Sequence, residues 1–288
     1  MKKILSILSL AILSTFMVPS VVFAAKPSSS GGPKPVATAE LVGYDISYPQ
    51  CGKRLPTGQY FGIVGVNGGT AATTNSCLVE QLVWANKSKT GSNQPKVQLY
   101  VNTANPGEVI SQITTWPTDN TDKTGYTTIN PYGTCSGLND TACSWQYGWN
   151  RSVEANLDRF VPAAKAAGIN QSASAYTWWL DVETMNSWQS GSPEAFDRNT
   201  ATLEGMKSYY KSQNATVGLY STAYQWGEIV GTSVTPSSNL NGLANWRPSG
   251  ASLSNAKNNC SLEPLTTGGF ISLTQYVQKN LDYNHSCI

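Results

Sequence analysis

Charged side chains are scarce in this sequence of 288 residues. Only 12% of the residues are charged, against about 25% in typical globular domains, and the formal net charge is +2. Lys2 and Lys3 lie in a segment that we expect to be removed, which leaves as many basic as acidic residues. We therefore expect no nucleic-acid partner and no electrostatic attraction to an anionic membrane.

Histidine is nearly absent, since His285 is the single one in the sequence. One histidine cannot supply a zinc site that needs several, and it makes a Ser-His-Asp triad or a histidine general base less plausible. We expect neither a metal nor an organic cofactor.

Long hydrophobic runs are also rare. The clear one extends from Ile4 to about Val18, after two lysines and before the small residues Ala24 and Ala25. It is shorter than the roughly 20 residues of a membrane-spanning helix, which favours a secretory signal peptide over residues 1–24 and leaves a membrane anchor as the alternative. After cleavage we expect no membrane contact and a secreted protein, extracellular or associated with a cell wall.

The sequence has six cysteines, and all of them follow this segment. An even number of cysteines in an oxidising compartment favours disulfides over a metal cluster. Sequence alone leaves the pairing open, although proximity along the chain favours Cys51–Cys77, Cys135–Cys143 and Cys260–Cys287.

Residues 25–39 are rich in serine, glycine and proline and offer almost nothing to bury, so we expect a flexible linker. Residues 40–288 contain no second linker of this kind and no internal repeat. They are expected to form one domain.

Strand-like apolar runs alternate with helical patterns along this domain. The expected strands lie within residues 41–47, 61–66, 97–102, 176–183, 217–221 and 270–277. One helix is expected to start with Ser192 as its N-cap and Pro193 as its first residue. Residues 105–149 have weak periodicity and are interpreted mostly as a long loop. The alternation favours a parallel sheet or a barrel.

Two carboxylates mark the end of the strand predicted within residues 176–183. Because strand residues two apart face the same side, Asp181 and Glu183 share one face with Trp179. Apolar neighbours would raise the pKa of one carboxyl and leave the other ionised, which is the division that glycoside hydrolysis needs. Simple solvation of both acids at a strand end is the alternative.

Two further acids and several aromatic residues point to the same chemistry. Asp45 lies near the end of an apolar strand, and Asp282 lies in a short motif near the other end of the domain. Sugar rings stack on aromatic side chains, and many of these lie at predicted strand ends or in loops; the candidates for substrate contact are Trp188, Tyr220, Trp226, Trp246 and Tyr276.

An ordered set of short motifs resembles family 25 of the glycoside hydrolases, which are secreted, lysozyme-like muramidases. The motifs are GYDISYPQ (43–50), FGIVGVNGG (61–69), LYVN (99–102), LDVE (180–183), GLYSTAYQW (218–226), LANW (243–246), LTQY (273–276) and LDYN (281–284). The sequence departs from the family in an enlarged segment between LYVN and LDVE, in its extra cysteines, and in Asn102, where a histidine is common.

The resemblance implies an α/β fold, a single irregular TIM-like (β/α) barrel in which some later strands lack helices. It implies that Glu183 is the general acid and that Asp181 stabilises positive charge on the sugar or orients its acetamido group. Asp45 and Asp282 would hold the substrate and tune Glu183. Asn102 and Gln275, which lie in the motifs, join the expected substrate-binding residues.

The sequence therefore predicts an enzyme that cleaves β-1,4 glycosidic bonds in peptidoglycan or a related wall glycan. A catalytically silent glycan-binding or cell-surface module on the same barrel is the main alternative, because a fold does not fix a function. A secreted interaction protein with incidental carboxylates is the third.

Overall fold

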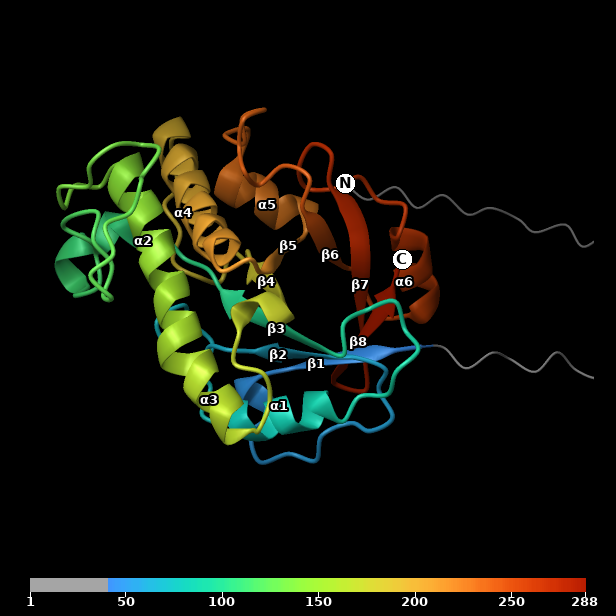
Figure 1. The fold of residues 1–288 in the computed structure, drawn as a ribbon. Coiled ribbons are helices and arrows are strands. Elements are labelled where there is room, and N and C mark those ends of the chain that lie inside the picture. The colour runs from blue at the N-terminus through green and yellow to red at the C-terminus, as the bar shows by residue number, and fades with distance from the viewer. Residues whose placement is uncertain (1–40) are drawn as a thin grey trace, which may run out of the picture. The chain divides into compact units, whose positions relative to one another are not determined.

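Eight strands form a closed barrel in the computed structural model, which describes residues 41–288 (Figure 1). The strands are β1 (Gly43–Ile46), β2 (Gly62–Gly65), β3 (Val97–Asn102), β4 (Thr177–Asp181), β5 (Thr216–Tyr220), β6 (Ala244–Pro248), β7 (Phe270–Gln278) and β8 (Leu281–Ser286). Each of the six expected strand segments overlaps one of them, although β5 begins one residue before its segment and β7 ends one residue after its own, whereas β6 and β8 were not expected. The predicted signal peptide (1–24) and linker (25–39) lie outside the described residues.

Strand direction changes at the end of the barrel. Strands β1 to β7 are parallel to one another, but β8, which lies between β7 and β1, is antiparallel to both. A tight turn joins β7 to β8, and both of its residues, Lys279 and Asn280, have positive φ angles, as hairpin turns require. The expectation of an α/β, TIM-like (β/α) barrel is therefore wrong. The fold is a closed eight-stranded mixed barrel with helices packed on its outside.

The helices precede or follow particular strands. They are α1 (Leu78–Asn86) between β2 and β3, α2 (Thr141–Glu154) and α3 (Val161–Ala166) before β4, α4 (Pro193–Ser212) before β5, α5 (Ala223–Val230) before β6 and α6 (Leu253–Asn259) before β7. A π-helical segment, Ala155–Phe160, joins α2 to α3, and short 3-10 turns lie at Tyr48–Gln50, Gly107–Gln112 and Ala173–Ala175. No helix within residues 41–288 is both long enough and apolar enough to cross a lipid bilayer.

The predicted start of α4 is confirmed. The Ser192 side chain accepts a hydrogen bond from the Ala195 backbone N–H at 3.2 Å, and Pro193 is the first helical residue. Serine at this position satisfies an N–H that the first turn leaves without a partner, and proline has no N–H to lose.

Two hydrophobic cores lie on opposite sides of the barrel wall, because alternate residues of a strand face opposite sides. In β4, Trp178 and Leu180 pack with the helices, whereas Trp179 lies inside the barrel, as the alternation in the sequence predicts. The barrel interior is filled by Phe61, Ile63, Trp179, Trp246 and Leu273. A glycine makes room for this filling, because a Cβ at Gly218 would lie 2.2 Å from the Trp179 ring.

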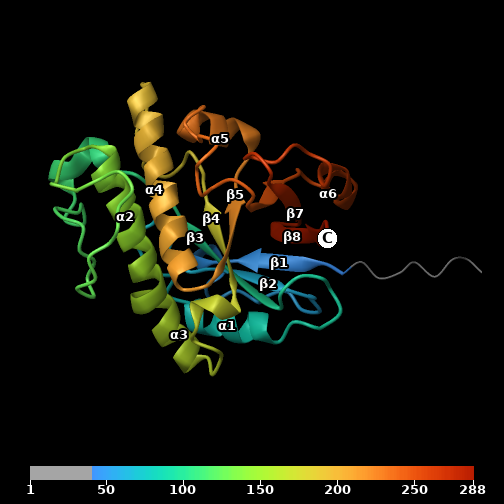
Figure 2. The same ribbon diagram turned by 45° about the horizontal axis from the view of Figure 1, so that its top comes forward.

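Helices α2 and α4 lie side by side in both ribbon views (Figures 1 and 2). Their backbones meet at two glycines: a Cβ at Gly148 would lie 1.9 Å from the Thr202 carbonyl oxygen, and one at Gly205 would lie 2.0 Å from that of Trp145. Helix α2 begins inside the segment that was expected to be mostly loop, so that expectation is wrong for residues 141–149.

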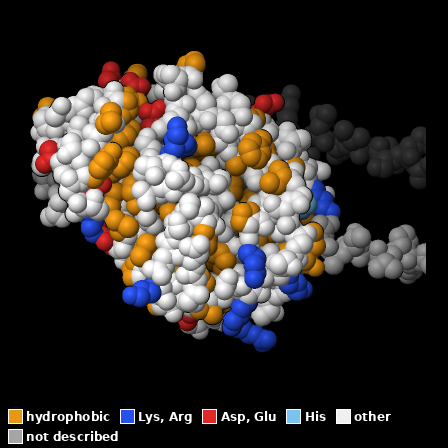
Figure 3. All heavy atoms as spheres, in the orientation of Figure 1, with side chains coloured by type: hydrophobic (Ala, Val, Ile, Leu, Met, Phe, Trp, Pro, Cys, Tyr) orange, Lys and Arg blue, Asp and Glu red, His pale blue; other side chains and the backbone are white. Residues whose placement is uncertain are grey.

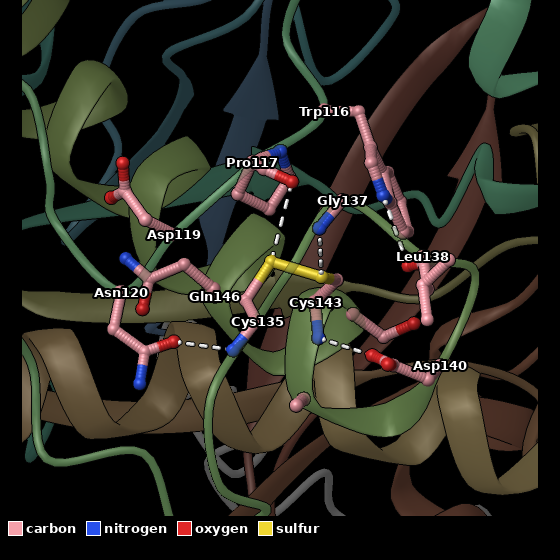
Figure 4. The surroundings of a disulfide bond; sticks show 12 residues. Trp116, Pro117, Asp119, Asn120, Cys135, Gly137, Leu138, Asp140, Cys143 and Gln146 are labelled. Atoms are coloured by element: carbon pink, nitrogen blue, oxygen red, sulfur yellow. Dashed lines mark hydrogen bonds between the residues drawn. A yellow bond between two sulfur atoms is a disulfide. The ribbon is translucent and has the colours of Figure 1, made fainter.

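Three disulfides join Cys51 to Cys77, Cys135 to Cys143 and Cys260 to Cys287, the pairings that chain proximity favours. The second joins the loop that precedes α2 to the first turn of α2 (Figure 4). There the Cys135 N–H donates to Asn120 Oδ1, and the Cys143 N–H donates to Asp140 Oδ1, both at 2.8 Å. The disulfide is thus continuous with a network that fixes the loop.

Candidate active site

A pocket of about 120 Å³ opens at the end of the barrel where the parallel strands finish. It is lined by Asp45, Tyr100, Asp181, Glu183, Tyr220, Trp246 and Gln275. Strands β1 and β4 supply Asp45 and Asp181, and Glu183 follows β4 by two residues. Asp282 is half-buried in β8, directly opposite Asp45 in the strand register. The barrel thus brings all four predicted acids to one end.

Asp45 is buried and is held by two amide side chains. Gln275 Nε2 donates to both carboxylate oxygens at 3.0 and 3.1 Å, and Asn284 Nδ2 donates at 2.6 Å. Burial raises the pKa of Asp45 well above its ordinary value, the charge of Asp282 raises it further, and the two amides oppose the rise. Asp45 is therefore a firmly oriented carboxyl that tends to keep a proton.

The amides that hold Asp45 are themselves oriented by aromatic residues. Trp246 Nε1 donates to Asn284 Oδ1 at 2.7 Å, and the Tyr220 hydroxyl donates to Gln275 Oε1 at 2.8 Å. Since each amide oxygen accepts, each amide nitrogen must point toward Asp45. The network fixes the orientation of Asp45 and of both amide side chains.

Asp181 lies in the other half and has few donors. Its Oδ2 accepts a hydrogen bond from Asn102 Nδ2 at 3.3 Å, while its Oδ1 is buried and has no partner. Burial raises the pKa of Asp181 well above its ordinary value, and the charges of Glu183 and Asp45 add to the rise. A buried carboxylate oxygen without a donor is rare and calls for an explanation, which a ligand N–H or O–H in this pocket would supply.

Glu183 is less buried than Asp181 and lies in the loop after β4. Burial raises its pKa above the ordinary value, which suits a group that must carry a proton near neutral pH. The Glu183 carbonyl oxygen accepts hydrogen bonds from Trp188 Nε1 at 2.9 Å and from the Asn186 N–H at 3.2 Å. These contacts fix the backbone that carries the Glu183 carboxyl.

The expected substrate-binding residues have different places. Tyr220, Trp246 and Gln275 line the pocket, and Asn102 contacts Asp181. The others lie elsewhere: Trp188 braces the Glu183 loop, Trp226 is buried in the core between barrel and helices, and Tyr276 stacks on Tyr283 with ring centres 5.1 Å apart.

Tyr100 lines the pocket but was not singled out from the sequence. It is two residues before Asn102 in β3, so the alternation of strand residues could have placed it on the same face. The ring fits because Gly65 opposes it: a Cβ there would lie 2.6 Å from Tyr100 Cζ. Burial raises the pKa of Tyr100 well above its ordinary value, and Asp181 adds to the rise, so its hydroxyl stays protonated.

Metal binding at this cluster of acids is not favoured by geometry. Within residues 41–288, no three histidine, cysteine, aspartate or glutamate side chains are grouped so that they could hold a metal ion. Asp45 and Asp181 instead accept hydrogen bonds from amide side chains.

Comparison with known proteins finds two partial matches. Residues 150–259 match the family described as Lysozyme-like protein 1. Lysozyme-like protein 5 of Caenorhabditis elegans is 42% identical over 79 residues, which are 27% of this chain and 31% of that protein. The chain is thus similar to lysozyme-like proteins over part of its length. It covers about a third of the curated relative that it matches, and no solved structure matches it.

The family match includes one part of the site and leaves out another. Residues 150–259 contain Asp181 and Glu183, together with Tyr220 and Trp246. Asp45 and the strands β7 and β8 lie outside it. The matches therefore show similarity to lysozyme-like proteins, and they do not single out one family of glycoside hydrolases.

Proposed function

We propose that this protein is a lysozyme-like glycoside hydrolase that cleaves β-1,4 bonds of peptidoglycan or a related wall glycan, in the manner of glycoside hydrolase family 25. One observation carries the proposal: a pocket with Glu183, whose pKa is raised by burial, beside the buried and partly unpartnered Asp181. A pair of carboxyls of this kind is what glycoside hydrolysis uses. The partial likeness to lysozyme-like proteins supports the same class.

In this proposal Glu183 protonates the glycosidic oxygen as the bond to the sugar breaks. Positive charge then develops on the sugar ring. Burial raises the pKa of Asp181 as well as that of Glu183, so Asp181 stabilises this charge in its ionised form, or orients the acetamido group that does so. Asp45 and Asp282 hold the substrate and help to keep a proton on the cluster, since like charges close together oppose one another's ionisation. Tyr220 and Trp246 offer ring surface to the sugar.

We also propose that the protein is secreted. Three disulfides within residues 41–288 are typical of an oxidising compartment. The residues predicted to direct secretion, 1–24, lie outside the part that the structure describes.

A reducing-end assay on purified peptidoglycan and chitin tests the proposal. We expect the wild type to release reducing ends and Glu183→Gln, which is a far poorer acid of the same size, to release them about 10²–10⁴ times more slowly. Glu80→Gln, on the outer helix α1, is the matched control and should keep the wild-type rate.

Two results would contradict this assignment. An active wild type whose Glu183→Gln variant keeps the full rate would remove Glu183 as the acid. A wild type that sediments with the glycan but releases no reducing ends would favour a glycan-binding module instead.

A further inference from the structure

A second pocket lies on the outside of the barrel, where the β3–β4 connection folds over the helices. It has a volume of about 430 Å³ and is lined by Asp122, Thr124, Tyr126, Trp149, Val153, Leu157, Tyr209, Ser212 and Gln213. Ser212 and Gln213 lie at the end of α4, just before β5 begins. The pocket is therefore near the starts of the strands, away from the end that carries the acids.

Aromatic rings form one wall of this pocket. Tyr126 stacks on Trp149 with ring centres 5.9 Å apart and planes inclined by 21°, and Trp149 in turn stacks on the buried Trp145. Tyr126 nevertheless keeps 53% of its surface exposed. It is the outermost ring of a stack that extends from the core to the solvent. Figure 3 shows hydrophobic side chains at several places on the visible face, the area over α2 among them.

The loop that carries Tyr126 is held rigidly by Asp122. One carboxylate oxygen accepts from the Thr124 N–H, the Thr124 hydroxyl and the Tyr126 N–H, and the other accepts from Trp149 Nε1 at 3.0 Å. Burial alone would raise the pKa of Asp122, but these hydrogen bonds lower it below its ordinary value. The ring is thus positioned in advance, which reduces the entropy lost when a ligand binds.

The pocket lining includes one charged side chain, Asp122, which is engaged by hydrogen bonds from the protein. The carboxylate of Asp122 is occupied by its four donors, and at the edge Lys123 pairs with Asp158. The remaining polar groups of the lining are neutral: they are the hydroxyls of Thr124, Tyr126, Tyr209 and Ser212, the indole N–H of Trp149 and the amide of Gln213. A flat apolar wall beside hydroxyl and amide groups fits a ligand with an apolar face and many hydroxyls, and a pyranose ring is such a ligand.

We propose that Tyr126 and this pocket form a second glycan-binding site, which takes a neutral pyranose of the polymer that the acid pocket cleaves. The inference rests on the proposed function for the identity of the polymer. Because the two sites lie at different ends of the barrel, the outer site holds the protein on an insoluble polymer without occupying the acid pocket. It also gives a use to the long β3–β4 connection.

Sedimentation of the full secreted protein with insoluble peptidoglycan and with chitin tests this site. Tyr126→Ala should bind the polymer about 5-fold more weakly, which is the effect of losing one stacked ring. Tyr126→Phe should bind as the wild type does. Ile129→Ala, 90% exposed in the same connection and outside the pocket, is the control and should change nothing. Hydrolysis of a short soluble glycan should be the same in all of them.

A variant at another place guards against a folding defect in the loop. Gln213→Ala lies at the end of α4 and should also weaken sedimentation, while its thermal unfolding stays that of the wild type. Undiminished sedimentation of both Tyr126→Ala and Gln213→Ala would overturn the inference, as would a wild type that binds neither polymer.

The outcomes separate this inference from the proposed function. A wild type without hydrolytic activity whose sedimentation still depends on Tyr126 would support the outer site and contradict the hydrolase. An active enzyme whose sedimentation depends on neither Tyr126 nor Gln213 would do the reverse.

Discussion

Asp181 and Asp122 are both buried carboxylates, and their surroundings are opposite. Asp122, in the β3–β4 connection, accepts four hydrogen bonds from its own chain, and its pKa is lowered. Asp181, in the acid pocket, accepts one long hydrogen bond from Asn102 and keeps an oxygen without a partner, and its pKa is raised. The chain stabilises the charge of the first and leaves that of the second uncompensated.

This contrast supports the proposal that Asp122 has a structural role and that Asp181 interacts with a ligand. Burying a charge without donors costs stability, so a fold keeps such a group where function requires it. Asp122 instead organises a loop, and the function of that loop lies in Tyr126. Substitution of the aspartate should therefore change the stability of the fold in opposite directions at the two places.

Asp181→Asn should show the largest effects. We expect turnover to fall about 10²–10³-fold, because the charge that stabilises the sugar cation is lost. The folded-state pKa of Asp181 is raised, so its ionisation destabilises the fold above that pKa and has no such effect below the unfolded value. The variant should therefore be more stable at neutral pH by about 0.5–2 kcal/mol. Urea denaturation at neutral pH and again at low pH, where the gain should vanish, measures this, and a loss of stability at neutral pH would contradict it.

Asp122→Ala should have the opposite outcome, with stability lost and chemistry kept. The change leaves Trp149 Nε1 and two backbone N–H groups without their acceptor, which should cost about 1–3 kcal/mol. Because the pKa of Asp122 is lowered, its contribution is present above the ordinary aspartate value and fades as pH falls toward the folded one. Hydrolysis of a short soluble glycan should be unchanged.

Asp158→Ala is the matched control for that loss. Its carboxylate pairs with Lys123 at the surface, and exposed pairs of this kind contribute about 0–1 kcal/mol. Equal losses of unfolding free energy in Asp122→Ala and Asp158→Ala would show that the four hydrogen bonds of Asp122 do not have the role given to them here.

The sequence predicted the parts of the molecule that follow simple periodic rules. Alternation along β4 placed Trp179 and Asp181 on one face, and the pair Ser192 and Pro193 marked the start of α4. The four acids that lie at one end of the barrel were picked out from their strand ends and from short motifs. These features depend on residues that are close together in the sequence, so they can be recognised from the sequence alone.

The rest depends on packing between distant segments. Strand β8 closes the barrel with Asp282 and Asn284 on its inner face, so it lacks the apolar alternation by which strands are recognised. Helix α2 packs closely on α4 at Gly148. Glycine is a poor helix former, so the sequence around Gly148 does not indicate a helix. The change from a TIM-like barrel to a mixed one follows from that single antiparallel strand, which the sequence did not reveal.

The pH dependence of turnover on a soluble glycan tests the central claim most directly, namely that Glu183 donates a proton from a pocket that raises its pKa. A general acid works only when protonated, so kcat should fall as pH rises through a pKa above the ordinary glutamate value. It should also fall at low pH, where Asp181 takes up a proton and loses the charge that stabilises the sugar cation. Glu80→Gln should give the same curve. A kcat that falls at the ordinary glutamate pKa, or that does not depend on pH, would contradict the account.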